Sequence, residues 1–63
     1  MKARIIKEFG KGDIGATALA LQMDKQRIRA WTEPMRKGQI DGVIAALVRQ
    51  NKPVPKWLLR SPA

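Results

Sequence analysis

A short stretch from residue 25 to residue 30 combines amide, cationic and small side chains that could recognise the edges of nucleic-acid bases. Gln26 can form two hydrogen bonds with adenine, and Arg29 can form two with guanine. Ala30 is small enough to lie against the methyl group of thymine. The candidate base contacts of this stretch are therefore Lys25, Gln26, Arg29 and Ala30.

These candidates would share one side of a helix if Ile28 and Trp31 face the interior. A rotation of about 100° per residue then points Gln26 and Ala30 almost directly outward. The two arginines of the stretch fall on the flanks of the helix. Glu33 would lie on the same outer face, where its carboxylate could either accept a hydrogen bond from a cytosine amino group or lie beyond the groove.

Cations near this stretch could contact phosphates, which would position a helix on DNA without discriminating bases. Lys11 and the backbone N–H groups after Asp13 would face the DNA backbone, as would the basic residues that follow the helix. The candidate phosphate contacts are Lys11, Arg27, Arg36 and Lys37. An ordinary solvated face is the alternative, but between residues 24 and 37 five cations accompany two carboxylates, so the local excess of positive charge is real.

The composition of the 63 residues excludes most catalytic chemistry. The sequence has no Cys, His or Tyr, so it offers no thiolate nucleophile, imidazole base, disulfide or zinc site of the usual kind. Asp13 and Asp24 precede helical patterns and are expected to cap helices rather than to act in catalysis. We therefore expect neither an enzyme nor a cofactor, a metal or a small-molecule substrate.

The net charge indicates a polyanionic partner. Thirteen Lys and Arg against five Asp and Glu give a formal charge of +8, which creates a strong positive field around so small a protein. Nucleic acid is the first candidate, with an anionic membrane and an acidic protein surface as alternatives. No apolar run approaches the roughly 20 residues of a membrane span, and the apolar stripe between residues 40 and 48 has few cations nearby, so we expect no membrane contact.

Hydrophobic residues recur at helical spacing almost throughout, and no segment shows the sustained alternation of a strand. We predict an all-α domain over residues 1–63, with four short helices and a terminal helical turn. The first helix would end at a Gly10 cap, and the second would follow Asp13 as its N-cap. The third would begin after Asp24 and run from residue 25 to about 33, where Pro34 stops it.

A basic connector over residues 35–38 would lead to the fourth and clearest helix. Asp41 would lie in its first turn and Arg49 in its last, and a final turn after Pro55 would carry Trp57 and Leu58 inward. Both tryptophans are expected in the core rather than stacked on bases. The apolar stripe of the fourth helix is expected to face the core, with its edge and the Trp57 region shared with a second copy of the chain; the stripe comprises Ile40, Val43, Ile44, Leu47 and Val48.

The segment from residue 14 to residue 33 has the spacing of a helix-turn-helix, with two short helices joined by a three-residue turn. Ala18 is small where the two helices would cross, and Ile28 would meet it from the second helix. In such a motif the second helix enters the major groove, which is about 12 Å wide. The core of the motif would consist of Ala18, Leu21, Met23, Ile28 and Trp31.

A resemblance to a known family rests on the run Ile5-Ile6-Lys7-Glu8-Phe9-Gly10, followed by Ala18-Leu19-Ala20-Leu21, Met23, Ile28, Trp31 and Glu33. These residues, in about the first half of the chain, resemble the Cro repressors of lambdoid phages, and are most similar to the all-helical members. More weakly, Val54-Pro55-Lys56-Trp57-Leu58-Leu59 is similar to the last helix of small phage repressors.

The resemblance implies a lambda-repressor-like fold and a transcriptional repressor that binds its operator as a dimer. The recognition positions that it implies are Lys25, Gln26, Arg29 and Ala30. The sequence departs from the family at Gln22, where glycine usually occupies a left-handed turn. A non-glycine residue there costs about 1–2 kcal/mol.

The function expected is therefore that of a sequence-specific DNA-binding repressor in the cytoplasm of a bacterial host, acting as a homodimer on a pseudo-palindromic operator. The alternative from a different class is a small phage- or plasmid-encoded inhibitor that binds an acidic host protein. An RNA-binding protein is a third alternative that the charge leaves open.

Overall fold

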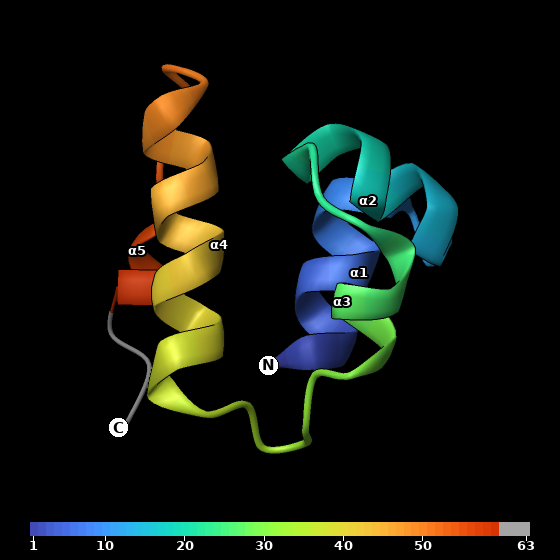
Figure 1. Cartoon of the computed structure of the whole chain (residues 1–63). Helices are drawn as coiled ribbons and strands as arrows, with labels where there is room; N and C mark the ends of the chain where they lie inside the picture. Colours follow the sequence, from blue (N-terminus) through green and yellow to red (C-terminus); the bar gives the residue numbers. More distant parts are fainter. Residues whose placement is uncertain (60–63) are drawn as a thin grey trace.

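Residues 1–59 are described by the computed structural model, and they fold into five α-helices with no strand among them (Figure 1). The helices are α1 (Lys2–Gly10), α2 (Ile14–Leu21), α3 (Lys25–Arg29), α4 (Lys37–Arg49) and α5 (Lys56–Leu59). The predicted all-α class is confirmed, and α5 is the predicted terminal turn. None of the helices within this range combines the length and the apolar character needed to cross a membrane.

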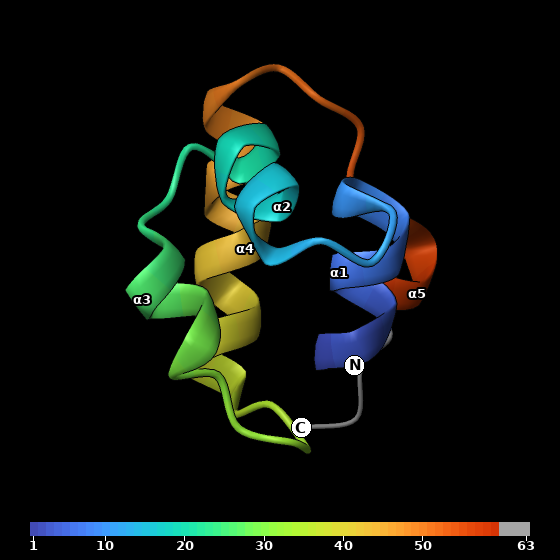
Figure 2. The same ribbon diagram turned by 90° about the vertical axis from the view of Figure 1, so that its right-hand side faces the viewer.

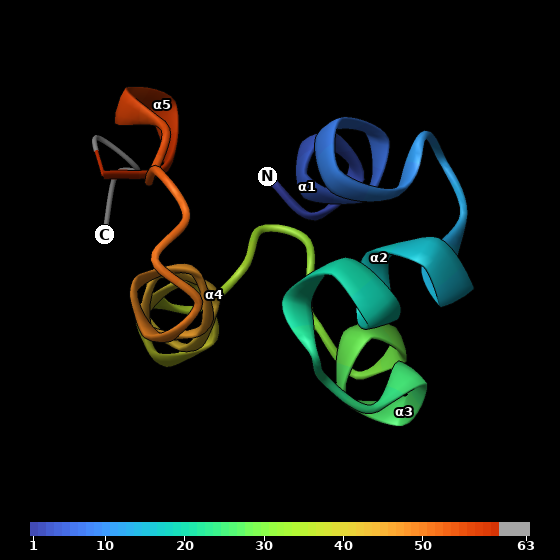
Figure 3. The same ribbon diagram turned by 90° about the horizontal axis from the view of Figure 1, so that it is seen from above.

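The core lies between two groups of helices. Helices α1, α2 and α3 form one side of the molecule, and α4 and α5 form the other (Figures 1 and 3). Trp31 is 5% exposed and belongs to the core, as predicted. Met35, which we predicted in a basic connector, is also buried there. The buried cluster comprises Ile5, Ala18, Leu21, Ile28, Trp31, Met35, Ile40, Val43, Leu47 and Leu58.

The connection between α1 and α2 corrects the predicted role of Gly10. The left-handed residue that ends α1 is Lys11, with φ of 52°, and its N–H donates to the carbonyl of Lys7 over 3.0 Å. Gly10 is instead the last helical residue and is buried against Thr17. Thr17 is itself fully buried, and its hydroxyl donates to the carbonyl of Asp13 over 2.8 Å. The missing side chain at Gly10 therefore lets α1 and α2 approach closely.

Helices α2 and α3 begin at the two predicted caps. The Asp13 carboxylate accepts a hydrogen bond from the Ala16 N–H over 2.7 Å, and Asp24 accepts one from the Gln26 N–H over 3.2 Å. Between the helices, Gln22 adopts φ of 54° and ψ of 46° and ends α2. The left-handed turn therefore forms although its residue is not glycine. The Met23 N–H donates to the carbonyl of Ala18 over 2.9 Å, which closes the turn.

Replacing Gln22 with glycine is expected to stabilise the protein by about 1 kcal/mol, because glycine adopts a left-handed conformation without a steric cost. The measurement is the midpoint of urea denaturation at constant m-value. Ala45→Gly is the matched control, since Ala45 is exposed within α4 and glycine in a helix interior costs about 0.5–1 kcal/mol. A loss of stability of the same size in both variants would contradict the strain assigned to Gln22.

Helix α3 is shorter than predicted, since it ends at Arg29 rather than near residue 33. The Trp31 N–H bonds to the carbonyl of Ile28, which tightens the chain after the helix. The Thr32 N–H then donates to the side chain of Gln39 over 3.2 Å instead of to a helical carbonyl. The Lys2 ammonium donates a hydrogen bond to the carbonyl of Trp31 over 3.0 Å. These tertiary partners replace the hydrogen bonds of another helical turn, so the helix ends before Pro34 can stop it.

Helix α4 begins at Lys37, inside the predicted connector, so Asp41 lies beyond its first turn and that part of the prediction is wrong. The Gln39 side chain accepts a hydrogen bond from the Arg36 N–H over 3.1 Å and so stabilises the new N-terminus. Most of the predicted stripe faces the core, but Val48 is 60% exposed and Ile44 is half-buried. Arg49 lies in the last turn, as predicted.

The end of the described chain packs back onto both sides of the molecule. Leu58 of α5 is buried, and Trp57 packs partly against the core. The guanidinium of Arg4 lies 4.3 Å from the centre of the Trp57 ring, a cation–π contact that links α1 to α5. In Figure 2 the segment after α4 crosses the top of the molecule and descends to α5, which lies behind α1 in this view. The Lys52 ammonium donates to the carbonyl of Ala20 over 2.9 Å and ties the chain after α4 to α2.

Candidate nucleic-acid interface

Helix α3 presents an exposed polar face above two buried anchors. Ile28 is completely buried and Trp31 nearly so, which fixes the orientation of the helix on the core. The four side chains predicted to contact bases are all exposed; they are Lys25, Gln26, Arg29 and Ala30. Of the predicted motif core, Ala18 and Leu21 are also buried, while Met23 is partly buried at its edge.

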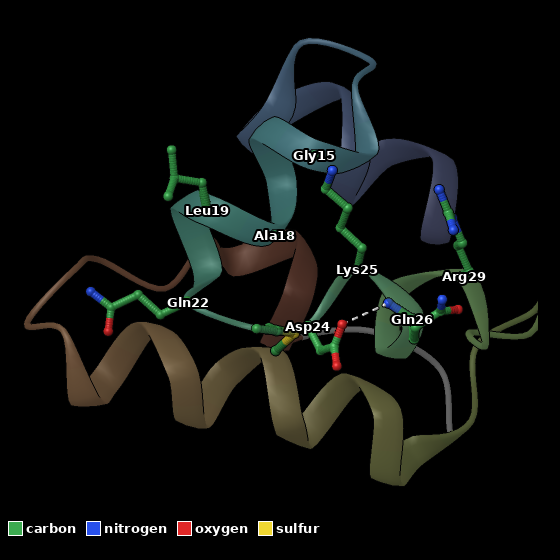
Figure 4. Close-up of a pocket in the computed structure, with 9 residues that line it drawn as sticks. Gly15, Ala18, Leu19, Gln22, Asp24, Lys25, Gln26 and Arg29 are labelled. Carbon is green, nitrogen blue, oxygen red and sulfur yellow. Dashed lines mark hydrogen bonds between the residues drawn. The ribbon is translucent and has the colours of Figure 1, made fainter.

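An open hollow of about 580 Å³ runs between α2 and α3 beside this face (Figure 4). Asp24 lies at the boundary between the two helices, where its carboxylate is bonded to the Gln26 N–H. Three of the predicted base contacts line the hollow, whereas Ala30 does not. The lining residues are Gly15, Ala18, Leu19, Gln22, Met23, Asp24, Lys25, Gln26 and Arg29.

Leu19 is a surface residue of this hollow that the sequence prediction did not include. It is 82% exposed, the largest exposed fraction among the big apolar side chains of residues 1–59. A signal was present in the sequence, because Leu19 is an apolar residue of this segment that does not belong to the predicted motif core. The structure thus adds an apolar border to a predominantly polar surface.

The two flanks of α3 are in contact with different helices. On one flank, Lys25 rises toward Gly15 (Figure 4), where its Cε lies 3.4 Å from the position that a Cβ of Gly15 would occupy. An oxygen of the Asp13 carboxylate lies 3.1 Å from the same position. On the other flank, an Nη of Arg27 lies 3.4 Å from the corresponding position at Gly42 of α4. Lys25 thus lies over the start of α2, and Arg27 lies against α4.

The predicted phosphate contacts are exposed but belong to separate elements. Lys11 is in the loop between α1 and α2, Arg36 precedes α4, and Lys37 is the first residue of α4. Arg27 lies between the exposed face of α3 and α4. The structure therefore distributes these cations around α3 rather than along a single helix.

Glu33 does not lie on the outer face of α3, and this part of the prediction is wrong. The helix ends four residues before it, and its carboxylate accepts hydrogen bonds from the N-terminal amine of Met1 over 3.1 Å and from the Ala3 N–H over 3.3 Å. These bonds, led by the one from the amine, lower the pKa of the Glu33 carboxyl below its usual value. Glu33 thus connects the loop after α3 to the start of α1.

Within residues 1–59 the carboxylates either cap helices or lie apart from one another. Asp13 and Asp24 cap helices, and no three His, Cys, Asp or Glu side chains within residues 1–59 come together as metal ligands. The surface around α3 offers the exposed amide of Gln26 and the exposed cations Lys25 and Arg29.

Comparison of this chain with protein-family models, with curated proteins and with solved structures finds no match.

Proposed function

We propose that this chain is a Cro-like transcriptional repressor, in which α2 and α3 form a helix-turn-helix and α3 enters the major groove of DNA. The observation that carries the proposal is the exposed face of α3 above the buried Ile28 and Trp31. An α-helix with its side chains is about 10–12 Å in diameter, which matches the width of about 12 Å of the major groove. The net charge of +8 supports a polyanionic ligand.

The local structure supports a rigid presentation of this face. Asp24 caps the start of α3, and the Lys2 ammonium bonds to the carbonyl of Arg29 over 3.4 Å at its end. The left-handed Gln22 sets the angle between α2 and α3. A recognition element that is already held in place loses less conformational entropy on binding.

Two copies are proposed to bind a pseudo-palindromic operator in the cytoplasm of a bacterial host. Their recognition helices would enter major grooves with centres about 34 Å apart. The edge of α4 and the Trp57 region are the proposed contact between copies, because Val48 is 60% exposed while Ile44 and Trp57 are half-buried. Occupation of the operator would repress transcription by excluding RNA polymerase.

Selection from a pool of random DNA duplexes at physiological salt tests this proposal. The expected result is enrichment of a sequence with approximate two-fold symmetry and half-sites about one helical turn apart. Affinity for this sequence should exceed that for its scrambled version by at least about 10³-fold. Equal affinity for the enriched pool and the starting pool would refute the proposal.

A second candidate function is inhibition of an acidic host protein. The strongly exposed Leu19 favours it, because an apolar side chain that lines the same hollow as Lys25 and Arg29 could contact a partner with mixed apolar and acidic character. Leu19→Ser distinguishes the two functions. The substitution should leave selection of a DNA sequence intact if the chain is a repressor, and it should weaken binding to the protein partner if the chain is an inhibitor.

A further inference from the structure

One side of α4 carries charges of both signs and apolar side chains, and no other helix of residues 1–59 covers it. Helices α2 and α5 contact α4 from other directions, and the remaining side faces away from them (Figure 3). Its exposed residues are Asp41, Ala45, Val48 and Arg49, and Ile44 is half-buried at its edge. These five residues form the outer face of α4.

The two charged groups of the outer face have no ionic partner within residues 1–59. The ion pair formed in this range joins the Met1 amine to Glu33. Arg49 has no Asp or Glu within four positions of it in either direction along the sequence. A symmetric partner supplies both missing charges at once, because a two-fold contact places residue i of one copy against residue j of the other, and j against i.

We propose that a second copy of this chain docks on the outer face of α4, with the two α4 helices antiparallel and the two-fold axis beside Ala45. The proposal rests on the proposed function, and it specifies the α4 part of the contact in the dimer. The Asp41 carboxylate of each copy then faces Arg49 of the other copy, so two identical ion pairs form. The apolar side chains of Ile44 and Val48 pack against their counterparts between these pairs.

The spacing along α4 fits this arrangement. Asp41 and Arg49 lie four residues before and four residues after Ala45, which is about 6 Å on either side along the helix axis and about 40° on either side around it. Reversing the second helix at Ala45 therefore brings its Arg49 to the height of Asp41. Packed helices have axes about 8–10 Å apart, and the small side chain of Ala45 at the centre permits this approach.

The signs of the charges select the antiparallel direction. In a parallel pair, Asp41 would face Asp41 and Arg49 would face Arg49, and like charges across an interface oppose association. The antiparallel pair also places the positive N-terminal end of each helix dipole beside the negative C-terminal end of the other. Charge complementarity therefore favours a second copy in one orientation.

Charge reversal in the full chain tests the ion pairs, with dimerisation measured by sedimentation equilibrium in the absence of DNA. A contact made by one helix from each copy is small, so we expect a wild-type Kd of about 10 µM or weaker. Asp41→Arg and Arg49→Asp should each raise the Kd by at least about 10-fold, because each variant sets like charges opposite one another at two places. The variant with both substitutions restores opposite charges, and its Kd should return to within about 3-fold of the wild-type value.

Two substitutions in α1 are the matched controls. Glu8→Arg and Lys7→Asp change the net charge by the same amounts as the two reversals, at exposed positions of another helix. The Kd of both controls should stay within about 3-fold of the wild-type value. Circular dichroism of each variant verifies that the helices are retained.

A disulfide cross-link locates the two-fold axis without any change of charge. The sequence has no cysteine, so Ala45→Cys introduces a single thiol. The Cα atoms at the centre of the contact would be about 4–6 Å apart, as a disulfide requires, so mild oxidation should link two copies. Ala3→Cys at an exposed position of α1 is the matched control, and it should form dimers at least about 10-fold more slowly.

The outcomes separate this interface from the repressor function. A wild-type chain that remains monomeric at about 1 mM, or charge reversals that do not compensate each other, would overturn the interface. Equal rates of cross-linking for Ala45→Cys and Ala3→Cys would also overturn it. A symmetric duplex enriched by selection would leave the repressor function intact in each of these cases. Compensating charge reversals without any enriched duplex would support the interface and refute the repressor.

Discussion

Raising the salt concentration from about 50 to about 200 mM is expected to lower the affinity of the proposed dimer for its operator by about 10⁴-fold. The physical reason is the release of counterions from DNA when cations of the protein neutralise phosphates. Each copy contributes four proposed phosphate contacts, so a dimer would neutralise about eight phosphates, with a log–log slope near −7. The four residues are Lys11, Arg27, Arg36 and Lys37, all of which are exposed.

Lys37→Ala provides the matched variant for this experiment. Lys37 is exposed at the first residue of α4, so the substitution should not disturb the core. Because a dimer carries two copies, we expect the slope to become less steep by about 2, and cognate and scrambled duplexes to lose affinity by the same factor. A slope that is unaffected by Lys37→Ala would exclude this residue from the phosphate contacts. A slope near zero for the wild-type protein would contradict DNA binding through the positive surface.

Gly10→Ala is expected to destabilise the fold strongly although it adds only one methyl group. A Cβ at Gly10 would overlap the hydroxyl of Thr17 and would lie 2.6 Å from its backbone nitrogen and 3.0 Å from its Cα. A new side-chain rotamer cannot relieve contacts with the backbone, so α1 and α2 would have to separate. Overpacking of this kind costs about 1–3 kcal/mol or more, which is a large part of the stability of so small a domain.

Gly38→Ala is the control, because nothing lies within 4 Å of the position of its Cβ. Gly38 is in the first turn of α4, where alanine should preserve or slightly raise the melting temperature. For Gly10→Ala we expect a fall of roughly 4–8 °C for each kcal/mol lost. Similar melting temperatures for the two variants would show that the close approach at Gly10 does not limit the packing of α1 on α2.

Local capping chemistry made the helix starts around the candidate interface predictable. A carboxylate can accept a hydrogen bond from a free backbone N–H two or three residues later, and Asp13 and Asp24 both do so. The burial of Ile28 and Trp31 was predictable for a related reason, since their spacing places both on one side of the chain. Information of this kind lies within a few residues along the sequence.

Long-range partners account for the errors. The end of α3 depends on two side chains from distant parts of the chain. Lys2 donates a hydrogen bond to the carbonyl of Trp31, and Gln39 accepts one from the N–H of Thr32. The N-terminal amine, thirty-two residues away along the chain, bonds to Glu33 and holds its carboxylate outside the proposed interface. The pattern of hydrophobic residues does not reveal such hydrogen bonds, so the prediction based on it extended the helix as far as Pro34.

The amino-acid sequence alone determined the helical class of this protein, its positive charge and the side of α3 that is buried, because helix propensity, capping and charge are properties of short segments. The tertiary structure decided where the exposed cations of α3 lie relative to the other helices. Lys25 lies over Gly15 of α2, Arg27 lies against Gly42 of α4, and Arg29 borders the hollow between α2 and α3. These positions arise from the packing of three helices, and no local pattern of residues encodes them.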